Sequence, residues 1–324
     1  MTRQRAGAAL LVLLVTLFAA APVLGPNDPR QQFPDHAFAP PMRPHLVHEG
    51  GIRPPFIYPV RVTDRRGRQF EQDSRPVPIE FLENGRLATT DPSSPWLLLG
   101  GDPLGRDVFS RVLNGGRLSL GVATIAVALA LAIGALLGAA AGFAGGRTDR
   151  FITGLADFTI VVPMLYAVVT LRAVMPLAPA PSTIFWTMAI VMALATWPLP
   201  ARGVRAIIAA ERRTAYAEAA YAAGAGPLRI LLRHLLPAAA GHVAIQGFLL
   251  FPAFIFTEAT LSFVGLGFAE PASSWGVMLQ DAARLSAMTD APWLLAPAAA
   301  IVVTVVAARM LAGDRAGLAP SAKG

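Results

Sequence analysis

The sequence contains no cysteine, and its single lysine is Lys323. Without cysteine the chain can form no disulfide bond, no thiolate metal site and no thiol nucleophile. A P-loop needs a lysine that reaches the β and γ phosphates of a bound nucleotide. A lone lysine at position 323 therefore excludes nucleotide hydrolysis by that route.

Other catalytic patterns are missing as well. There is no G-x-S-x-G elbow, residues 48–52 read HEGGI rather than H-E-x-x-H, and no apolar run carries paired carboxylates. His36, His45 and His48 have no carboxylate or cysteine at metal-binding spacing, so we expect solvated loop residues and no metal site. The sequence predicts a non-catalytic chain without a cofactor of its own.

Charge is also scarce. Only 15% of residues are charged, 54% are hydrophobic and the mean hydropathy is +0.53, which is typical of a multispanning membrane protein. The net charge of +7 could suggest nucleic acid, but the basic residues cluster beside apolar runs, as membrane topology requires. We therefore predict an all-α polytopic membrane protein that contacts lipid and binds no nucleic acid.

Six apolar runs can cross a bilayer, for which about 20 residues are needed. They are residues 6–27, 118–146, 151–171, 173–201, 235–269 and 291–308. The first run also has the features of a secretory signal, but its apolar core of about 19 residues exceeds the 7 to 15 of a signal. We expect residues 1–27 to be a retained first span.

Basic residues beside the spans predict the orientation. With a cytoplasmic N-terminus, the inside segments carry thirteen arginine and lysine residues, whereas the short outside loops carry two, Arg172 and Arg284. The long segment 28–117 is left out because long loops translocate largely regardless of charge. Both termini and residues 202–234 are thus predicted to be cytoplasmic, and residues 28–117 extracytoplasmic.

The segment between the first two spans is divided in two by its composition. Residues 25–59 contain nine prolines, which favour an extended polyproline-like arm over helix. The stretches FIYPVRVTDRRGRQFEQ and PVPIEFLENGRLATT then alternate apolar and polar residues around turn signals, as hairpin strands do. We predict a Pro-rich arm with a small β-rich extracytoplasmic insertion over 28–95, a membrane domain over 96–316 and a C-terminal tail over 317–324.

Two carboxylates lie inside predicted spans, Asp157 and Glu258. Each is expensive in hydrocarbon and should face other helices or a polar cavity, either as a pathway or gating residue or as a hydrogen-bonded contact between helices. The small residues of LGAAAGFAGG, 137–146, should instead let two helices pack closely.

The connection between the fourth and fifth spans is longer than a simple loop. We predict an alanine-rich helix over 205–223, a stop at Gly224 with positive φ, and a new short helix from Pro227 through residue 236. Arg229 and Arg233 share one face of this second helix. Such a unit is either a docking surface for a partner protein or an amphipathic hairpin that rests on lipid.

Several motifs resemble those of one transporter family. Glu218-Ala219-Ala220, Gly224 after three intervening residues, and Leu236-Pro237 look like the E-A-A loop of ABC importer permeases. RHLLPAA, GGDPLGRDVFSRVLNGGRLSL (100–120), TEATLSFVGLG (257–267) and SSWGVML (273–279) are similar to motifs of the dipeptide, oligopeptide and nickel permease family. Gly101 and Ala238 depart from its usual threonine and asparagine, and the 28–95 insertion is longer than in common members.

The resemblance implies a division of labour between chains. This subunit would pair with a second, different permease, while two cytoplasmic ATPases bind ATP and Mg²⁺ and an extracytoplasmic binding protein delivers substrate at the bacterial inner membrane. The residues implied to couple to the ATPase are Glu218, Ala219, Ala220, Gly224, Arg229, Arg233, Leu236 and Pro237, and those of the outer motif are Asp102, Gly105, Arg106 and Asp107. The alternative class is an ion-driven secondary transporter or channel with Glu258 as the coupling carboxylate.

Overall fold

The computed structural model describes residues 2–48, 51–64, 67–174, 176, 179–283 and 289–312. The predicted tail 317–324 lies outside the described residues, as do Arg284 and Lys323. The chain divides into two compact units: the first comprises Met1–Ala8, Val122–Phe256 and Ala308–Gly324, and the second Ala9–Gly121 and Thr257–Ala307. Each unit is described by itself below.

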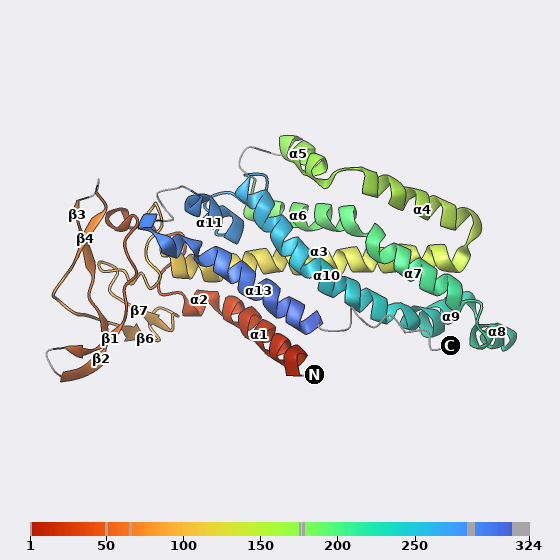
Figure 1. The fold of residues 1–324 in the computed structure, drawn as a ribbon, viewed down its shortest axis with the longest axis horizontal. Helices are drawn as coiled ribbons and strands as arrows, with labels where there is room; N and C mark the ends of the chain where they lie inside the picture. Colours follow the sequence, from red (N-terminus) through yellow and green to blue (C-terminus); the bar gives the residue numbers. More distant parts are fainter. Residues whose placement is uncertain are drawn as a thin grey trace. The chain divides into compact units, whose positions relative to one another are not determined.

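Helices dominate the described chain, as predicted (Figure 1). Their bounds are α1 Thr2–Ala19, α2 Ala21–Leu24, α3 Val108–Ala144, α4 Gly146–Val161, α5 Met164–Val174, α6 Pro181–Thr196, α7 Pro198–Glu211, α8 Ala215–Ala222, α9 Pro227–Ile230, α10 Leu236–Phe263, α11 Trp275–Ala282 and α13 Ala296–Ala312. Short 3₁₀ turns occur at η1 Pro34–His36 and η3 Pro292–Leu295, and a π-helical turn, η2, at Leu231–Leu235.

Three helical segments are long and apolar enough to span a membrane, namely Val108–Ala144, Pro227–Phe263 and Pro292–Ala312. Two bent pairs, α4 with α5 and α6 with α7, raise the number to five if each pair is one span. These five correspond to the last five predicted spans. The N-terminal run forms α1 and α2, which are not among the candidates in the described chain, so a sixth span stays a prediction.

The two bent spans differ from the unbroken segments that the apolar runs suggest. The bend between α4 and α5 is 79° and lies at Pro163, and that between α6 and α7 is 44° and lies just before Pro198. Proline lacks an N–H group and its ring clashes with the preceding helical turn, so a helix bends or restarts where it occurs.

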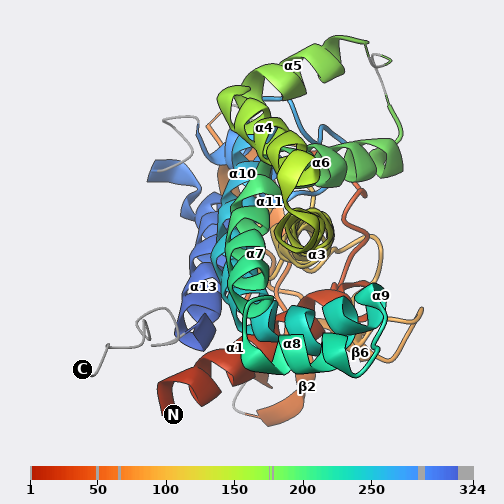
Figure 2. The same ribbon diagram turned by 90° about the vertical axis from the view of Figure 1, so that its right-hand side faces the viewer.

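Small residues on α3 allow close packing against α7 in the first unit, and Figure 2 looks along α3 with α7 beside it. A Cβ atom added at Gly134 would lie 2.5 Å from Pro200 Cγ, and one at Gly138 would lie 2.4 Å from the Ala201 carbonyl oxygen. A Cβ atom added at Gly142 would likewise lie 2.5 Å from the Arg205 carbonyl oxygen. Because residues four apart share a helix face, these three glycines form one seam, which confirms the packing predicted for 137–146.

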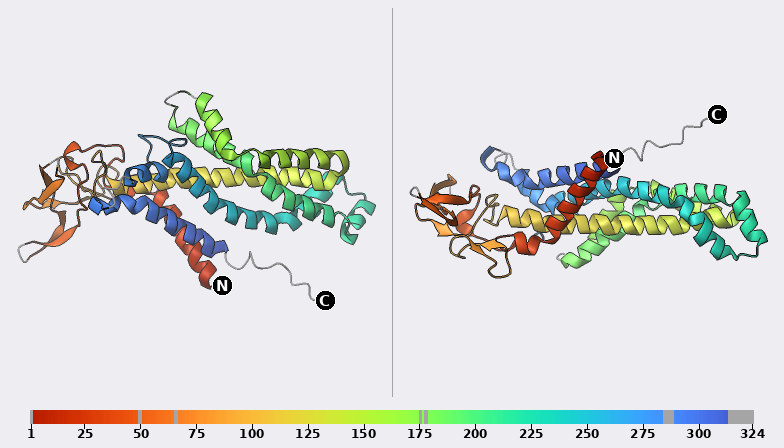
Figure 3. Two further views of the ribbon diagram at one scale, coloured as in Figure 1. Left: turned by 45° about the horizontal axis from the view of Figure 1, so that its top comes forward. Right: turned by 90° about the horizontal axis from the view of Figure 1, so that it is seen from below.

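The strands belong to the second unit, and Figure 3 shows those of residues 45–72 gathered in one small region, coloured orange. Their bounds are β1 His45–His48, β2 Gly51–Ile57, β3 Val60–Asp64, β4 Gln69–Gln72, β5 Val77–Pro78, β6 Glu80–Phe81 and β7 Ala88–Thr89. They form three antiparallel sheets, β1-β2-β5, β3-β4 and β6-β7.

Two of the three sheets are hairpins that the sequence predicts. The β6–β7 turn has positive φ at both Asn84 and Gly85, the conformation that an Asn-Gly turn favours. In contrast, the extended arm predicted over 25–59 is partly wrong, because β1 and β2 lie within it. Pro54 and Pro55 fall in β2 where the β1–β2 register is interrupted, so their missing N–H groups break no ladder pair.

Asp107 caps the start of α3 from within the second unit. Its Oδ1 accepts a hydrogen bond from the Phe109 backbone N–H at 3.0 Å, and its Oδ2 accepts from Ser110 Oγ at 2.5 Å and from Asn27 Nδ2 at 3.2 Å. The side chain is fully buried. Burial raises the pKa of Asp107 to about 6, although the hydrogen bonds from Ser110 and Asn27 act in the opposite direction.

The glycine seam generates a stability prediction. Replacing Gly138 with leucine should force α3 away from α7 and destabilise the chain by about 1–3 kcal/mol, the usual range for overpacking. Gly154→Leu on α4 is the matched control, because no described atom lies within 4 Å of a Cβ placed there. The measurement is the thermal midpoint of the detergent-purified protein. Equal midpoints for the two variants would contradict the seam.

The buried cap generates a pH prediction. A folded-state pKa of about 6 against an ordinary 3.8 means that Asp107 favours folding when protonated. This stability is fully present below pH 3.8 and is lost as pH rises through 6. Asp107→Asn keeps an acceptor for the cap but carries no charge. As the pH rises from 4 to 7, the variant should therefore become more stable relative to wild type, by up to about 3 kcal/mol in free energy of unfolding. The measurement is the thermal midpoint of both proteins across this pH range. A pH-independent difference between the two proteins would contradict the prediction.

Candidate functional site

The E-A-A loop, residues 205–237, lies in the first unit and differs in part from the prediction. The single helix expected over 205–223 is two helices, since α7 ends at Glu211 and α8 begins at Ala215. The turn between them is fixed by Glu211, whose carbonyl oxygen accepts from Thr214 Oγ1 at 2.6 Å and whose Oε2 accepts from the Tyr216 hydroxyl at 2.5 Å. Arg212 also donates to the Phe143 carbonyl oxygen at the end of α3.

Gly224 ends α8 as predicted, with a φ of 78°. Its N–H donates to the Tyr221 carbonyl oxygen at 3.0 Å, and the Ala225 N–H donates to the Ala220 carbonyl oxygen at 3.1 Å. This pair of bonds is the Schellman motif, in which a left-handed residue satisfies the last carbonyl groups of a helix. Gly224 is thus required by the backbone, independently of any partner.

The second short helix predicted over 227–236 does not end before the fifth span. It begins at Pro227 as expected, but α9 passes through the π turn η2 into α10, so that Pro227–Phe263 is one helical segment of 37 residues. Pro237 explains the turn, because its missing N–H removes one helical bond and the Leu236 N–H instead reaches back to the Leu231 carbonyl oxygen.

The loop is a packed object with an exposed cleft. Ala217, Ile230 and Leu235 are buried against Val204 and Ile208 of α7, and Figure 2 shows α8 and α9 side by side. A cleft of about 570 Å³ is lined by Ala220, Ala223, Gly224, Ala225, Arg229, Arg233 and His234.

Four of the predicted coupling residues, Ala220, Gly224, Arg229 and Arg233, meet in this cleft. The other four, Glu218, Ala219, Leu236 and Pro237, do not line it. Glu218 and Ala219 are exposed on α8.

The two carboxylates predicted inside spans have different surroundings. Asp157 on α4 pairs with Arg202 on α7 at 2.6 Å, and both side chains are more than half exposed, at 59% and 51%. Glu258 on α10 is fully buried in the second unit, where its Oε1 accepts from Ser262 Oγ at 2.8 Å. Ser262 Oγ in turn accepts from the Phe268 N–H at 3.1 Å. Both carboxylates thus contact other polar groups, and their roles in transport stay predictions.

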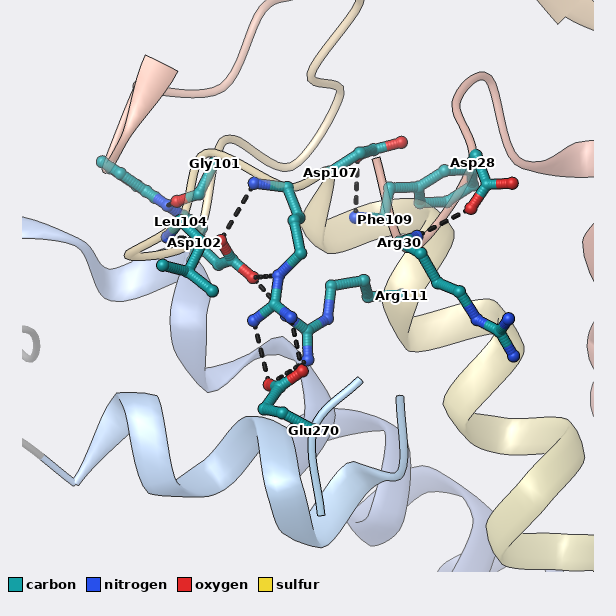
Figure 4. Close-up of polar contacts among 11 residues, drawn as sticks. Asp28, Arg30, Gly101, Asp102, Leu104, Asp107, Phe109, Arg111 and Glu270 are labelled. Carbon is teal, nitrogen blue, oxygen red and sulfur yellow. Dashed lines mark hydrogen bonds and ion pairs between the residues drawn. The ribbon is translucent and has the colours of Figure 1, made fainter. Parts of the chain in front are cut away.

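The outer motif forms the other candidate site, which we call the arginine–carboxylate network and define as Asp102, Arg106, Arg111 and Glu270. Arg106 Nε donates to Asp102 Oδ2 at 2.6 Å and its Nη2 donates to Glu270 Oε1 at 2.9 Å. Arg111 Nη2 reaches the same Glu270 oxygen at 2.9 Å. Further contacts join Arg106 Nη1 to Glu270 Oε2 and Arg111 Nη1 to Asp102 Oδ2. Figure 4 shows Asp102 and Glu270 pointing toward Arg111.

The turn that begins the motif depends on Asp102 and Gly105. Asp102 Oδ1 accepts from the Leu104 N–H at 2.8 Å and from the Arg106 N–H at 2.9 Å. Gly105 has a φ of 74°, and a Cβ atom there would lie 1.9 Å from the Phe33 carbonyl oxygen. Only glycine fits this position without displacing the backbone of residue 33.

The charges of the network shift each other's pKa values. Burial by itself raises the pKa of Glu270, but the hydrogen bond from Arg106 and the charge of Arg111 outweigh it, so the pKa is lowered. Burial lowers the pKa of Arg106, yet Glu270 and Asp102 raise it overall. The pKa of nearby Asp281 is raised, first by burial and then by the charge of Asp102. Two guanidinium groups and two carboxylates balance, as buried charges require.

Sequence reasoning missed Glu270 and Asn27 and did not single out Arg111. Arg111 is part of the quoted motif at 100–120, so the signal for it was present. Glu270 follows the 257–267 motif by three residues but is 159 residues from Arg111, and sequence spacing gives no signal for that contact.

The histidines are placed differently from the solvated loop that was expected. His48 Nδ1 is 2.8 Å from the Tyr58 hydroxyl, and the His45 ring stacks on Phe56 with 5.9 Å between centroids. Both belong to β1 and are half-buried. Within the described ranges no group of three or more histidine, aspartate or glutamate residues is arranged to hold a metal ion.

Comparison with known proteins identifies the family. Residues 134–313 match the family described as "Binding-protein-dependent transport system inner membrane component". The chain is 37% identical over 227 residues to the oligopeptide transport system permease protein OppC of Bacillus subtilis (strain 168), covering 70% of this chain and 72% of the relative.

Two further relatives extend the match. Identity is 34% over 247 residues to the glutathione transport system permease protein GsiD of Pectobacterium atrosepticum, covering 75% of this chain and 78% of the relative. It is 30% over 318 residues to the di/tripeptide transport system permease protein DppC of Pseudomonas aeruginosa, covering 97% and 87%. The chain therefore belongs to the family of binding-protein-dependent transport system inner membrane components, as a permease subunit of an ABC importer in the bacterial inner membrane.

Proposed function

We propose that this permease carries a peptide or a related small solute inward as one half of a heterodimer with a second, different permease. Two cytoplasmic ATPase subunits bind ATP and Mg²⁺ and drive transport, and an extracytoplasmic binding protein delivers the substrate. The chain itself holds no cofactor. The names of the relatives support the substrate class, since they refer to oligopeptides, glutathione and di- or tripeptides.

The E-A-A loop carries the proposal that the ATPase docks on this chain. The exposed Leu228 and Leu232 would also suit a lipid surface, but the cleft at residues 220–234 is concave and lined by small residues with Arg229, Arg233 and His234, and a flat bilayer surface would not fill it. The loop is also fixed by the Schellman bonds at Gly224 and by the buried side chains of Ile230 and Leu235. A rigid, charged cleft favours a protein partner over a lipid surface.

The second candidate function is an ion-driven transporter with Glu258 as coupling carboxylate. Such a residue must reach water to exchange ions. Glu258 is fully buried and its Oε1 accepts a hydrogen bond from Ser262. These observations favour the ATP-driven importer.

Gly224→Val should uncouple transport from ATP hydrolysis. A β-branched residue at a φ of 78° is strained by about 1–2 kcal/mol, which would open the Schellman turn and distort the cleft. Gly226→Val is the matched control, because Gly226 has a φ of −66° and no described atom lies within 4 Å of its added Cβ. We expect substrate-stimulated ATP hydrolysis in proteoliposomes to fall about tenfold in the first variant only.

Glu218→Lys, an exposed charge reversal, should have the same effect more weakly. Co-purification of the ATPase is measured in parallel, so that lost docking is separated from lost coupling. If substrate still stimulates ATP hydrolysis fully in Gly224→Val, the coupling proposal is wrong, and the loop is better explained as a hairpin that rests on lipid.

The proposed sidedness is testable because the chain contains no cysteine. Ser74 and Ala222 are both exposed, the first in the strand-bearing segment and the second on α8. In intact cells an impermeant thiol reagent should label Ser74→Cys but not Ala222→Cys, and permeabilisation should expose the second. Labelling of Ala222→Cys from outside would overturn the orientation.

A further inference from the structure

The arginine–carboxylate network is built from two parts that differ strongly in solvent exposure. Asp102, Arg106 and Arg111 lie within ten residues of one another, and their side chains are at most 3% exposed. Glu270 comes from a distant segment, and its side chain is 43% exposed. Asp102, Arg106 and Arg111 are therefore enclosed by the protein. Glu270 is the member whose side chain water can reach.

Glu270 lies in the middle of its own segment, residues 264–274, between α10 and α11. The start of this segment is bound to α10, because the N–H groups of Leu266 and Gly267 donate to the Leu261 carbonyl oxygen and the buried Phe268 N–H donates to Ser262 Oγ. Its end is bound through Ser274, which caps α11 by accepting from the Val277 N–H. Between these anchors, Ala269 and Pro271 are exposed.

We propose that Glu270 is the releasable latch of the network. It positions residues 269–273 against the start of α3 in the resting permease, and it leaves Arg106 and Arg111 when the loaded binding protein acts on the transporter. Glu270 is a positioning residue, since it acts through the segment that it holds. The role of the binding protein rests on the proposed function, whereas the contact of Glu270 with the two arginines does not.

The energetics of the contact suit a latch. Release removes the Glu270 carboxylate from both guanidinium groups and leaves them with Asp102 and the nearby Asp281, and the lost charge-assisted hydrogen bonds disfavour the open state. Because Glu270 is partly exposed, it gains water as it leaves, so the difference between the states is smaller than for a fully buried charge. A pair buried on both sides would hold the segment permanently.

The test uses a reporter in the latched segment. Ala272 is 6% exposed, so Ala272→Cys in this cysteine-free chain should react slowly with a thiol reagent in the resting transporter complex. Adding Glu270→Gln, which keeps the shape but removes the charge, should speed labelling about tenfold. Glu270→Asp, which keeps the charge on a shorter side chain, should give an intermediate rate. Glu80→Gln is the control, an exposed glutamate on β6 outside the network.

Hydrolysis is measured with and without loaded binding protein in the same complexes. We expect Glu270→Gln to raise basal hydrolysis at least threefold and to reduce the further stimulation by binding protein. A purely structural role would lower both. Unchanged labelling in Glu270→Gln, or failure of that variant to accumulate in the membrane, would overturn the latch.

The two proposals fail separately. If the wild-type complex is stimulated by binding protein but labelling is indifferent to residue 270, the latch is wrong and the proposed function stands. If labelling depends on residue 270 but the wild type shows no stimulation, the hold of Glu270 on residues 269–273 stands, whereas its release by a binding protein and the proposed partners are wrong.

Discussion

The helices of this permease depend on one constraint, which is that every backbone N–H and C=O group in hydrocarbon must find a partner within the protein. A proline in the middle of a helix has no N–H group to donate, so one carbonyl group of the preceding turn loses its helical partner. Pro163 and Pro198 mark bends of 79° and 44°, and Pro237 directly follows a π turn, whereas Pro252 stands inside α10. The helix pattern of the permease domain therefore depends on where its prolines fall.

Buried charge follows the same rule at the start of α3. Arg106 and Arg111 are enclosed, and two carboxylates accept their hydrogen bonds and balance their charges. One carboxylate, Asp102, also shapes the turn that presents the arginines. The other, Glu270, ties that turn to the segment after α10. Local turn chemistry and a long-range ion pair thus belong to a single structure.

Local chemistry could be predicted from the sequence and long-range chemistry could not. Gly224 and the Asn84-Gly85 turn were readable because each conformation is encoded by the residue itself. The break at residues 212–214 was missed because no glycine or proline marks it, and its hydrogen bonds come from Thr214 and Tyr216. Strands β1 and β2 were missed because prolines argued against them, and Glu270 because nothing near it in sequence indicates its partners.

The π turn at Leu231–Leu235 has a mechanical consequence. A π turn holds one more residue than the α turn that it replaces. If it returned to α geometry, the residues on its N-terminal side would rotate by about 100° and advance by about 1.5 Å along the helix axis. Arg229 would sweep through that rotation while Pro252 and the helix beyond kept their register. The turn therefore sets the rotation of Arg229 and the charged cleft relative to the membrane-spanning helix that continues from it.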